Sequence, residues 1–168
     1  IVAQFFHQFR LIVVGHVITN GVNRKGTQIA HIHVINNHTD FYIAPEWEAH
    51  VKVIHNVAQP DFATAMLARM WNTAIIHGFK DLKNPDADIV VTSQDDTVWD
   101  KEWIPKLLTV MKNNDFYADD AGDMVCAYTP NAIKKIGMWD ERFHYGFGEG
   151  DYFLRAIRWN ADKSSIND

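Results

Sequence analysis

Residues 88–97 read Asp-Ile-Val-Val-Thr-Ser-Gln-Asp-Asp-Thr. The stretch opens with consecutive β-branched residues, which are typical of a strand buried on both faces of a sheet. It closes on two adjacent carboxylates, and Asp is seldom buried for packing reasons alone. In open α/β sheets, ligands bind outside the carboxyl ends of the strands. We therefore expect a buried strand over residues 88–91 whose polar end, at Asp95 and Asp96, belongs to a ligand site.

Strands and helices alternate on both sides of this segment. Short apolar runs predict further strands at residues 1–6, 31–35, 51–54 and 124–128. Apolar spacing, N-caps and glycine stops predict helices over about 8–19, from Asp61 past Ile75, from about Pro105 to Lys112, at 130–137 and at 149–160. This alternation predicts an α/β fold with a mostly parallel sheet flanked by helices. We expect one domain over residues 1–168.

Composition excludes several classes of protein. The chain has 168 residues, 16 basic and 21 acidic side chains, and a net charge of −5, so it lacks the basic excess of a nucleic-acid-binding protein. The single cysteine, Cys126, excludes an internal disulfide and favours a reducing, cytoplasmic location (the host cytoplasm for a viral protein). No apolar run approaches the ~18 residues of a membrane span. Because the chain starts at Ile1 without Met, we expect a piece of a longer protein with possible further domains.

The acids after the central strand favour a metal site. Mg²⁺ and Mn²⁺ are commonly held by one or two carboxylates together with substrate phosphates. Asp95 and Asp96 fit that donor set, although helix capping before Trp99 is the simpler alternative. The literal Asp-x-Asp at Asp86 and Asp88 precedes the strand and lies at the wrong end of it. We expect Asp86 to serve the turn after Pro85.

A second acidic feature is the segment Gly146-Phe-Gly-Glu-Gly-Asp151, which stands directly before the last expected helix. Its glycines allow the backbone to approach a ligand closely. Glu149 and Asp151 then either cap the helix N-terminus or supply a general base to a cleft. Trp139, a few residues earlier, is expected in the core.

The order of these motifs resembles that of GT-A glycosyltransferases, in particular family-2-like enzymes of bacterial or viral origin that use nucleotide-sugar donors. The resemblance covers nearly the whole chain. The matching segments are, in order, Phe5-Phe-His-Gln8, Val34-Ile-Asn-Asn-His-Thr-Asp40, Val51-Lys-Val-Ile-His-Asn56, the helix with Arg69 and Asn72, the strand ending Gln94-Asp-Asp96, and Gly137-Met-Trp-Asp-Glu-Arg-Phe143 with Glu149, Asp151 and Arg155.

The resemblance implies a role for each matching residue. Phe5 or Phe6 would pack on the base of the nucleotide, with His7 near the same donor-binding cleft, and Asn36 or Asn37 would hydrogen-bond the base. Arg69 and Asn72 would contact the base or its phosphates. Gln94 stands where the family usually has the first Asp, so Asp95 and Asp96 would share the ribose and a Mn²⁺ or Mg²⁺ ion. Glu149 or Asp151 would be the catalytic carboxylate, and the sequence leaves that choice open.

We therefore expect a metal-dependent glycosyltransferase that moves a sugar, from a UDP-sugar by preference, to a glycan hydroxyl. One alternative is a nucleotide-sugar-binding module without activity. A sugar-phosphate nucleotidylyltransferase is another, although residues 5–9 offer no glycine-rich loop. A metal hydrolase built on His31 and His33, which share one face of a strand, is the third.

Overall fold

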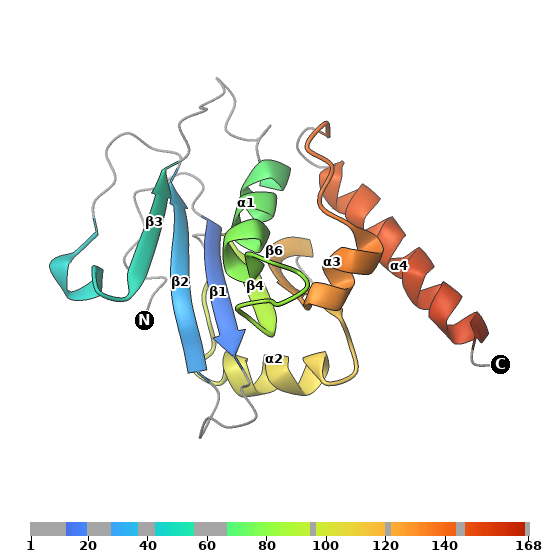
Figure 1. Cartoon of the computed structure of the whole chain (residues 1–168), viewed down its shortest axis with the longest axis horizontal. Helices are drawn as coiled ribbons and strands as arrows, with labels where there is room; N and C mark the ends of the chain where they lie inside the picture. Colours follow the sequence, from blue (N-terminus) through green and yellow to red (C-terminus); the bar gives the residue numbers. More distant parts are fainter. Residues whose placement is uncertain are drawn as a thin grey trace.

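The computed structural model describes residues 13–19, 28–36, 43–55, 67–94, 97–119, 122–143 and 147–166. These residues form a mixed α/β fold around one six-stranded sheet (Figure 1). The strands are β1 (Val13–Thr19), β2 (Gln28–Asn36), β3 (Val51–His55), β4 (Ile89–Ser93), β5 (Phe116–Asp119) and β6 (Gly122–Tyr128). The helices are α1 (Leu67–Phe79), α2 (Trp103–Met111), α3 (Pro130–Ile136), α4 (Gly148–Ile166) and a short 3-10 turn, η2 (Pro45–Trp47).

The sheet is mixed, but it is not mostly parallel as expected. Its strand order is β3-β2-β1-β4-β6-β5. Only β2 and β3 pair in parallel, whereas β1 is antiparallel to both β2 and β4, and β6 is antiparallel to β4 and β5. The expectation of a mostly parallel sheet was wrong because alternation along the chain does not fix the direction of β1.

The helix expected over residues 8–19 is also wrong for its described part. Val13–Thr19 is a strand in the middle of the sheet, paired on both of its edges. Its sequence, Val-Val-Gly-His-Val-Ile-Thr, is rich in β-branched residues, which lose side-chain freedom in a helix and favour strands. A central strand need not alternate polar and apolar residues, so the spacing resembled that of a helix. The strand expected at residues 1–6 lies outside the described residues.

Strands β2, β3, β4 and β5 all end at one edge of the sheet, which we call the carboxyl edge. The register shows this directly, because Val14 of β1 lies opposite both Val34 near the end of β2 and Ser93 at the end of β4. Asn36 at the end of β2 lies opposite His55 at the end of β3. The expected convergence of the second and fourth strand ends is thus confirmed for the described residues.

Helices cover both faces of the sheet. On one face α1, α3 and α4 pack with alternate strand residues such as Val90 and Cys126, forming what we call the α1-face cluster. On the other face α2 packs with Ile89, Val91 and their neighbours, forming the α2-face cluster. Gly78 allows α1 to approach the sheet closely, because a Cβ there would lie 2.4 Å from a methyl carbon of Val90.

The other expected elements are confirmed within the described residues. Strands β2, β3, β4 and β6 and helices α1, α2 and α4 cover the predicted segments, although residues 61–66 are outside the described part. Helix α3 begins after Thr129, whose side chain accepts from the Ala132 amide, and ends at Gly137 with φ of 92°. Strand β5 was not expected. No helix within the described residues has the length and apolarity needed to span a membrane.

Candidate functional site

The ends of β2 and β3 bring a buried amide and an exposed imidazole together. Asn36 is 2% exposed, and its Nδ2 lies 3.1 Å from Nδ1 of His55. An amide nitrogen only donates, so in this contact Asn36 is the donor and Nδ1 of His55 is the acceptor. His55 is exposed at the carboxyl edge. Asn36 therefore orients a second polar side chain at this edge, and its neighbour Asn37 lies outside the described residues.

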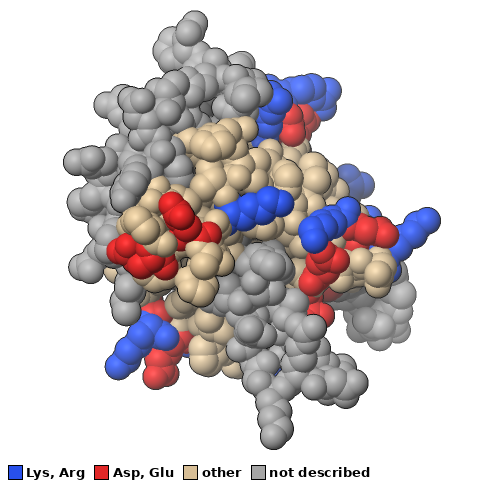
Figure 2. All heavy atoms as spheres, turned by 60° about the vertical axis from the view of Figure 1, so that its left-hand side comes forward, with Lys and Arg blue, Asp and Glu red and all other residues tan. Residues whose placement is uncertain are grey.

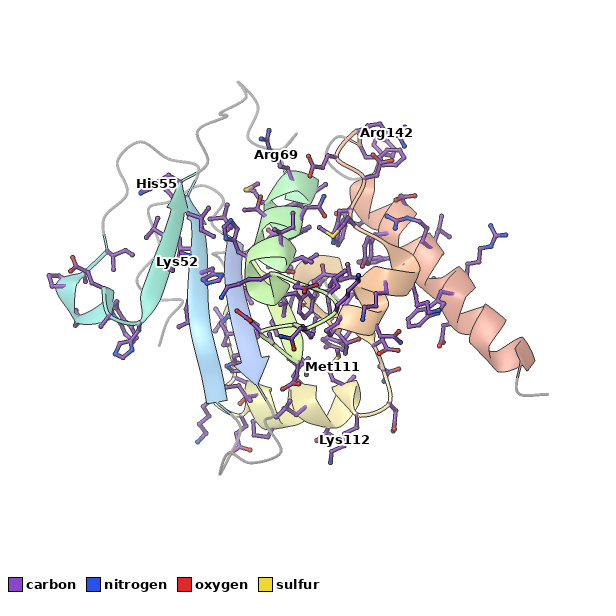
Figure 3. The ribbon with its side chains drawn as sticks, viewed as in Figure 1. Lys52, His55, Arg69, Met111, Lys112 and Arg142 are labelled. Carbon is purple, nitrogen blue, oxygen red and sulfur yellow. The ribbon has the colours of Figure 1, made fainter. Side chains whose placement is uncertain are left out.

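Arg69 lies in the first turn of α1 and is exposed. Figure 3 shows it at the same upper end of the molecule as His55, with Arg142 further along this end, whereas Met111 and Lys112 lie at the opposite end. No carboxylate among the described residues forms an ion pair with Arg69. Its guanidinium thus leaves the carboxyl edge with a positive charge that an anionic ligand can use.

Asn72 does not face a ligand in this structure. It is 5% exposed, its Oδ1 accepts from the Trp139 amide at 2.9 Å, and its Nδ2 donates to the Trp139 carbonyl and to Glu141 Oε1, both at 2.9 Å. These three bonds use the donors and acceptor of the amide for the fold. Asn72 therefore has a structural role, because it fixes the segment that leads to α4, and its contact with a nucleotide stays a prediction.

The end of β4 is the point from which the two candidate metal ligands follow. The Gln94 backbone amide donates to the Met124 carbonyl at 3.0 Å, which fixes the residue directly after β4 against β6. Ser93 is 1% exposed and Gln94 is half-buried. Asp95 and Asp96 come next and lie outside the described residues, as do Phe5, Phe6 and His7.

The fit of a metal at this edge rests on the donor set. Carboxylate oxygens at the end of a buried strand are the ligands that Mg²⁺ and Mn²⁺ take together with phosphate oxygens. Within the described ranges no three His, Cys, Asp or Glu side chains gather in a way that could hold a metal, and Asp95 and Asp96 lie outside those ranges. The rejected Asp-x-Asp behaves as expected, because Asp86 forms an ion pair with Lys80 before β4 begins.

The structure separates the two acids at the start of α4. Asp151 accepts from Arg155 Nε at 3.0 Å and from Nη2 at 2.7 Å. Arg155 also donates to the carbonyls of Ile136 and Met138, so this ion pair fastens α4 to the end of α3. Glu149 is half-buried, and no described residue forms an ion pair or hydrogen bond with its carboxylate. Of the two acids, Asp151 is thus paired within the described residues and Glu149 is not.

Aromatic packing holds this segment in place. Trp139 is 3% exposed and stacks on Tyr152 of α4, with ring centroids 4.5 Å apart and planes 13° apart. Its indole donates to the Tyr128 hydroxyl at 3.0 Å. Complete burial raises the pKa of Tyr128 well above its usual value, so this hydroxyl stays neutral. The expected core position of Trp139 is confirmed.

The surface charge near the candidate site is mixed. Arg142 binds Asp140 through two nitrogens, and these hydrogen bonds lower the pKa of the Asp140 carboxyl to about 2. On the face shown in Figure 2, basic and acidic side chains alternate over the described residues and neither sign forms a continuous patch.

The sequence did not single out two residues that the structure places near the candidate site. His55 looked like an ordinary surface residue, although its place at the end of a strand was a usable signal. Asn72 donates a hydrogen bond to Glu141, which lies 69 residues later in the sequence, and no local sequence pattern predicts such a contact.

Fold and geometry thus define a mixed α/β domain with polar and charged side chains at the carboxyl edge of its sheet. Comparisons of the chain with protein-family models, with curated proteins and with solved structures each gave no match. The function must therefore be argued from the sequence motifs and from the site itself.

Proposed function

We propose that this chain is a GT-A-type, metal-dependent glycosyltransferase domain that takes its sugar from a nucleotide-sugar donor, by preference a UDP-sugar. The observation that carries the proposal is the end of β4, which lies at the carboxyl edge together with the ends of β2 and β3. Ligands of open α/β sheets bind outside the carboxyl ends of the strands. Gln94 directly follows β4, and Asp95 and Asp96 are the next two residues in the sequence.

The diphosphate of the donor would meet positive charge from two sources. Arg69 offers an exposed guanidinium at the carboxyl edge without an ion-pair partner among the described carboxylates. Asp95 and Asp96 would hold Mn²⁺ or Mg²⁺, which when bound neutralises the leaving diphosphate. His55, whose ring is hydrogen-bonded to the Asn36 amide, adds an imidazole at the same edge.

Glu149 is the proposed general base. It would take the proton of the acceptor hydroxyl while that oxygen bonds to the anomeric carbon and the nucleoside diphosphate leaves with the electrons of the broken bond. Asp151 is already paired with Arg155 and is assigned a positioning role, because it fixes the helix that carries Glu149.

Calorimetric titration with UDP and UDP-sugars, with and without Mn²⁺, tests donor binding. We expect binding that strengthens at least about tenfold with the metal, a difference of about 1.4 kcal/mol. Asp96→Ala should abolish that enhancement, whereas the matched control Asp86→Ala, at the rejected Asp-x-Asp, should keep it. Binding of no nucleotide sugar, or binding indifferent to metal, would contradict the proposal.

Turnover separates a transferase from a binding module. Glu149→Gln should retain donor binding and lose about 100-fold or more in kcat, which is the usual contribution of general base catalysis. Asp151→Asn should instead lower the melting temperature, because it breaks the ion pair with Arg155. Donor binding by the wild-type chain without sugar transfer to any acceptor would leave the binding module as the function.

A further inference from the structure

A pocket of about 220 Å³ lies between α2 and the β5–β6 part of the sheet, on the face opposite α1. Its floor is apolar, formed by Leu107 of α2 and Val125 of β6, which are 7% and 8% exposed. Val110 of α2 lies on its lining and is 39% exposed, so the pocket is open to solvent beside this residue.

Aromatic rings form much of the pocket wall. Trp99 and Trp103 pack against each other with ring centroids 4.2 Å apart and planes tilted by 45°, and Tyr117 of β5 lines the pocket as well. Aromatic faces offer large apolar contact areas, while the Tyr hydroxyl and the Trp N–H add hydrogen-bonding groups. Such a surface suits a ligand ring that has C–H groups on its faces and polar groups on its rim.

Charged groups supply the polar part of the lining. Asp100 and Lys106 form an ion pair of 2.5 Å with both side chains more than half exposed, and Asp119 lies at the end of β5. Two carboxylates against one ammonium disfavour a phosphate or another anion. The carboxylates can accept hydrogen bonds from ligand hydroxyl groups, and the ammonium can donate to the oxygens of such groups. The lining therefore fits a neutral polyhydroxylated molecule.

The volume of the pocket further limits the class of ligand that it can hold. Pockets for drug-sized ligands hold about 300–1,000 Å³, so 220 Å³ accommodates a single ring rather than a whole nucleotide. One side of the pocket lies toward the carboxyl edge, because Val125 on its floor is paired with Ser93 at the end of β4, whereas α2 extends to the opposite end of the molecule at Met111 (Figure 3). A ring bound beside Val125 would lie on the α2 side of β4, the strand that Asp95 and Asp96 follow in the sequence.

We infer that this pocket binds one neutral sugar ring, and that this ring belongs to the acceptor glycan. Its role as an acceptor subsite rests on the proposed transferase function, whereas the binding of a sugar ring does not. The donor nucleotide would remain at the carboxyl edge beside Arg69, so the two ligands use different groups of residues.

Nuclear magnetic resonance tests the binding directly. The indole N–H signals of Trp99 and Trp103 are assigned with the variants Trp99→Phe and Trp103→Phe. The wild-type chain is then titrated with the methyl glycosides of glucose, galactose and N-acetylglucosamine. We expect at least one glycoside to shift both signals with a Kd of about 1 mM, since a single ring makes few contacts.

A pocket-filling variant locates the bound ring. Val110→Phe should weaken glycoside binding at least about tenfold, a change of about 1.4 kcal/mol. Ile76→Phe is the matched control, because Ile76 is 59% exposed on α1, outside the pocket, and should bind as the wild type does. An unchanged amide spectrum away from the pocket verifies that both variants are folded.

The outcomes separate this inference from the proposed function. If no glycoside shifts the two indole signals, or if Val110→Phe binds as tightly as the wild type, the pocket is not a sugar site. Failure of UDP and Mn²⁺ to bind, with glycoside binding intact, would overturn the transferase function and leave the sugar site standing. Retained UDP binding by Val110→Phe is expected, because its substitution lies outside the donor site.

Discussion

The hydrogen bonds of Asn72 to the Trp139 backbone predict a large effect of one substitution on stability. In Asn72→Ala the amide and carbonyl of Trp139, a residue only 3% exposed, lose the partners that Asn72 now supplies. Leaving buried polar groups unsatisfied should lower the free energy of unfolding by about 2–3 kcal/mol. The urea midpoint should fall with an unchanged m-value. Arg69→Ala, an exposed change on the same helix, should stay within about 0.5 kcal/mol of the wild type. Equal effects of the two substitutions would show that Asn72 is no structural anchor.

The lowered pKa of His77 predicts that the stability of the fold depends on pH. Burial, and secondarily the charge of Lys52, lower its pKa below the ordinary 6.5, and its ring lies 6.2 Å from that of His33. The folded state thus binds this proton less readily than the unfolded state. The resulting stability is present above pH 6.5 and is lost as the pH falls through the lowered pKa.

Urea unfolding at intervals from neutral pH to about pH 5 measures this dependence. His77→Gln, which cannot take up a proton in this range, should show a smaller loss of stability on acidification than the wild type. Parallel losses in the two proteins would exclude a contribution from His77.

At the scale of elements, the contact between α1 and β4 depends on Gly78. A Cβ at this position would lie 2.4 Å from Cγ2 of the fully buried Val90, so one side chain must move. Gly78→Ala should lower the free energy of unfolding by about 1–3 kcal/mol, although alanine is the better helix former.

A double-mutant cycle tests whether that clash is the cause. Val90→Ala alone creates a cavity and should destabilise the fold by about 2 kcal/mol or more. In the double variant the new methyl group occupies part of the vacated space, so the combined loss should be smaller than the sum by at least about 0.5 kcal/mol. Additive losses would mean that α1 and β4 adjust independently.

Elements also show what the sequence could predict and what it could not. The N-cap Thr129 and the stop at Gly137 are local signals, and the structure reproduces both. Strand β1 was taken for a helix because a run of β-branched residues in a central strand has no alternation to read. Strand β5 has only four residues at the sheet edge and carries little pattern. The partners of Asn72 lie 67 and 69 residues away, and only the fold brings them together.

The candidate site, too, contains positions that the sequence could predict and a choice that it could not make. The strand-end positions of Asn36 and Gln94 followed from apolar runs that end in polar residues, and the structure places both at the carboxyl edge. The choice between Glu149 and Asp151 could not be made from spacing, because both stand in the first turn of one helix. The proposal of Glu149 rests on the ion pair between Asp151 and Arg155, a contact that depends on how α4 docks against α3.

On the scale of the whole molecule, the two hydrophobic clusters share one sheet. Neighbouring residues of β4 point to opposite faces, so Val90 belongs to the α1-face cluster and Val91 to the α2-face cluster. Cys126 and Ala127 divide in the same way on β6. Because the same strands contribute side chains to both clusters, disruption of those strands would disrupt both clusters together. We therefore expect the described domain to unfold in one cooperative step, although 168 residues slightly exceeds the usual size for such behaviour.

Leu107→Ala tests this cooperativity from one face. Leu107 is 7% exposed in the α2-face cluster, and its truncation should cost about 2–5 kcal/mol. Far-ultraviolet circular dichroism follows all helices and strands, whereas near-ultraviolet dichroism reports aromatic packing, including Trp71 and Trp139 of the α1-face cluster. If the sheet couples the faces, both signals should shift to the same lower urea midpoint in the variant and remain superimposable. Because Trp99 and Trp103 pack on the α2 face, a near-ultraviolet or far-ultraviolet transition that splits into two steps would show that the two faces unfold separately. In that case the sheet would not transmit the destabilisation from the α2 face to the α1 face. The α2-face pocket would then belong to a layer that unfolds independently.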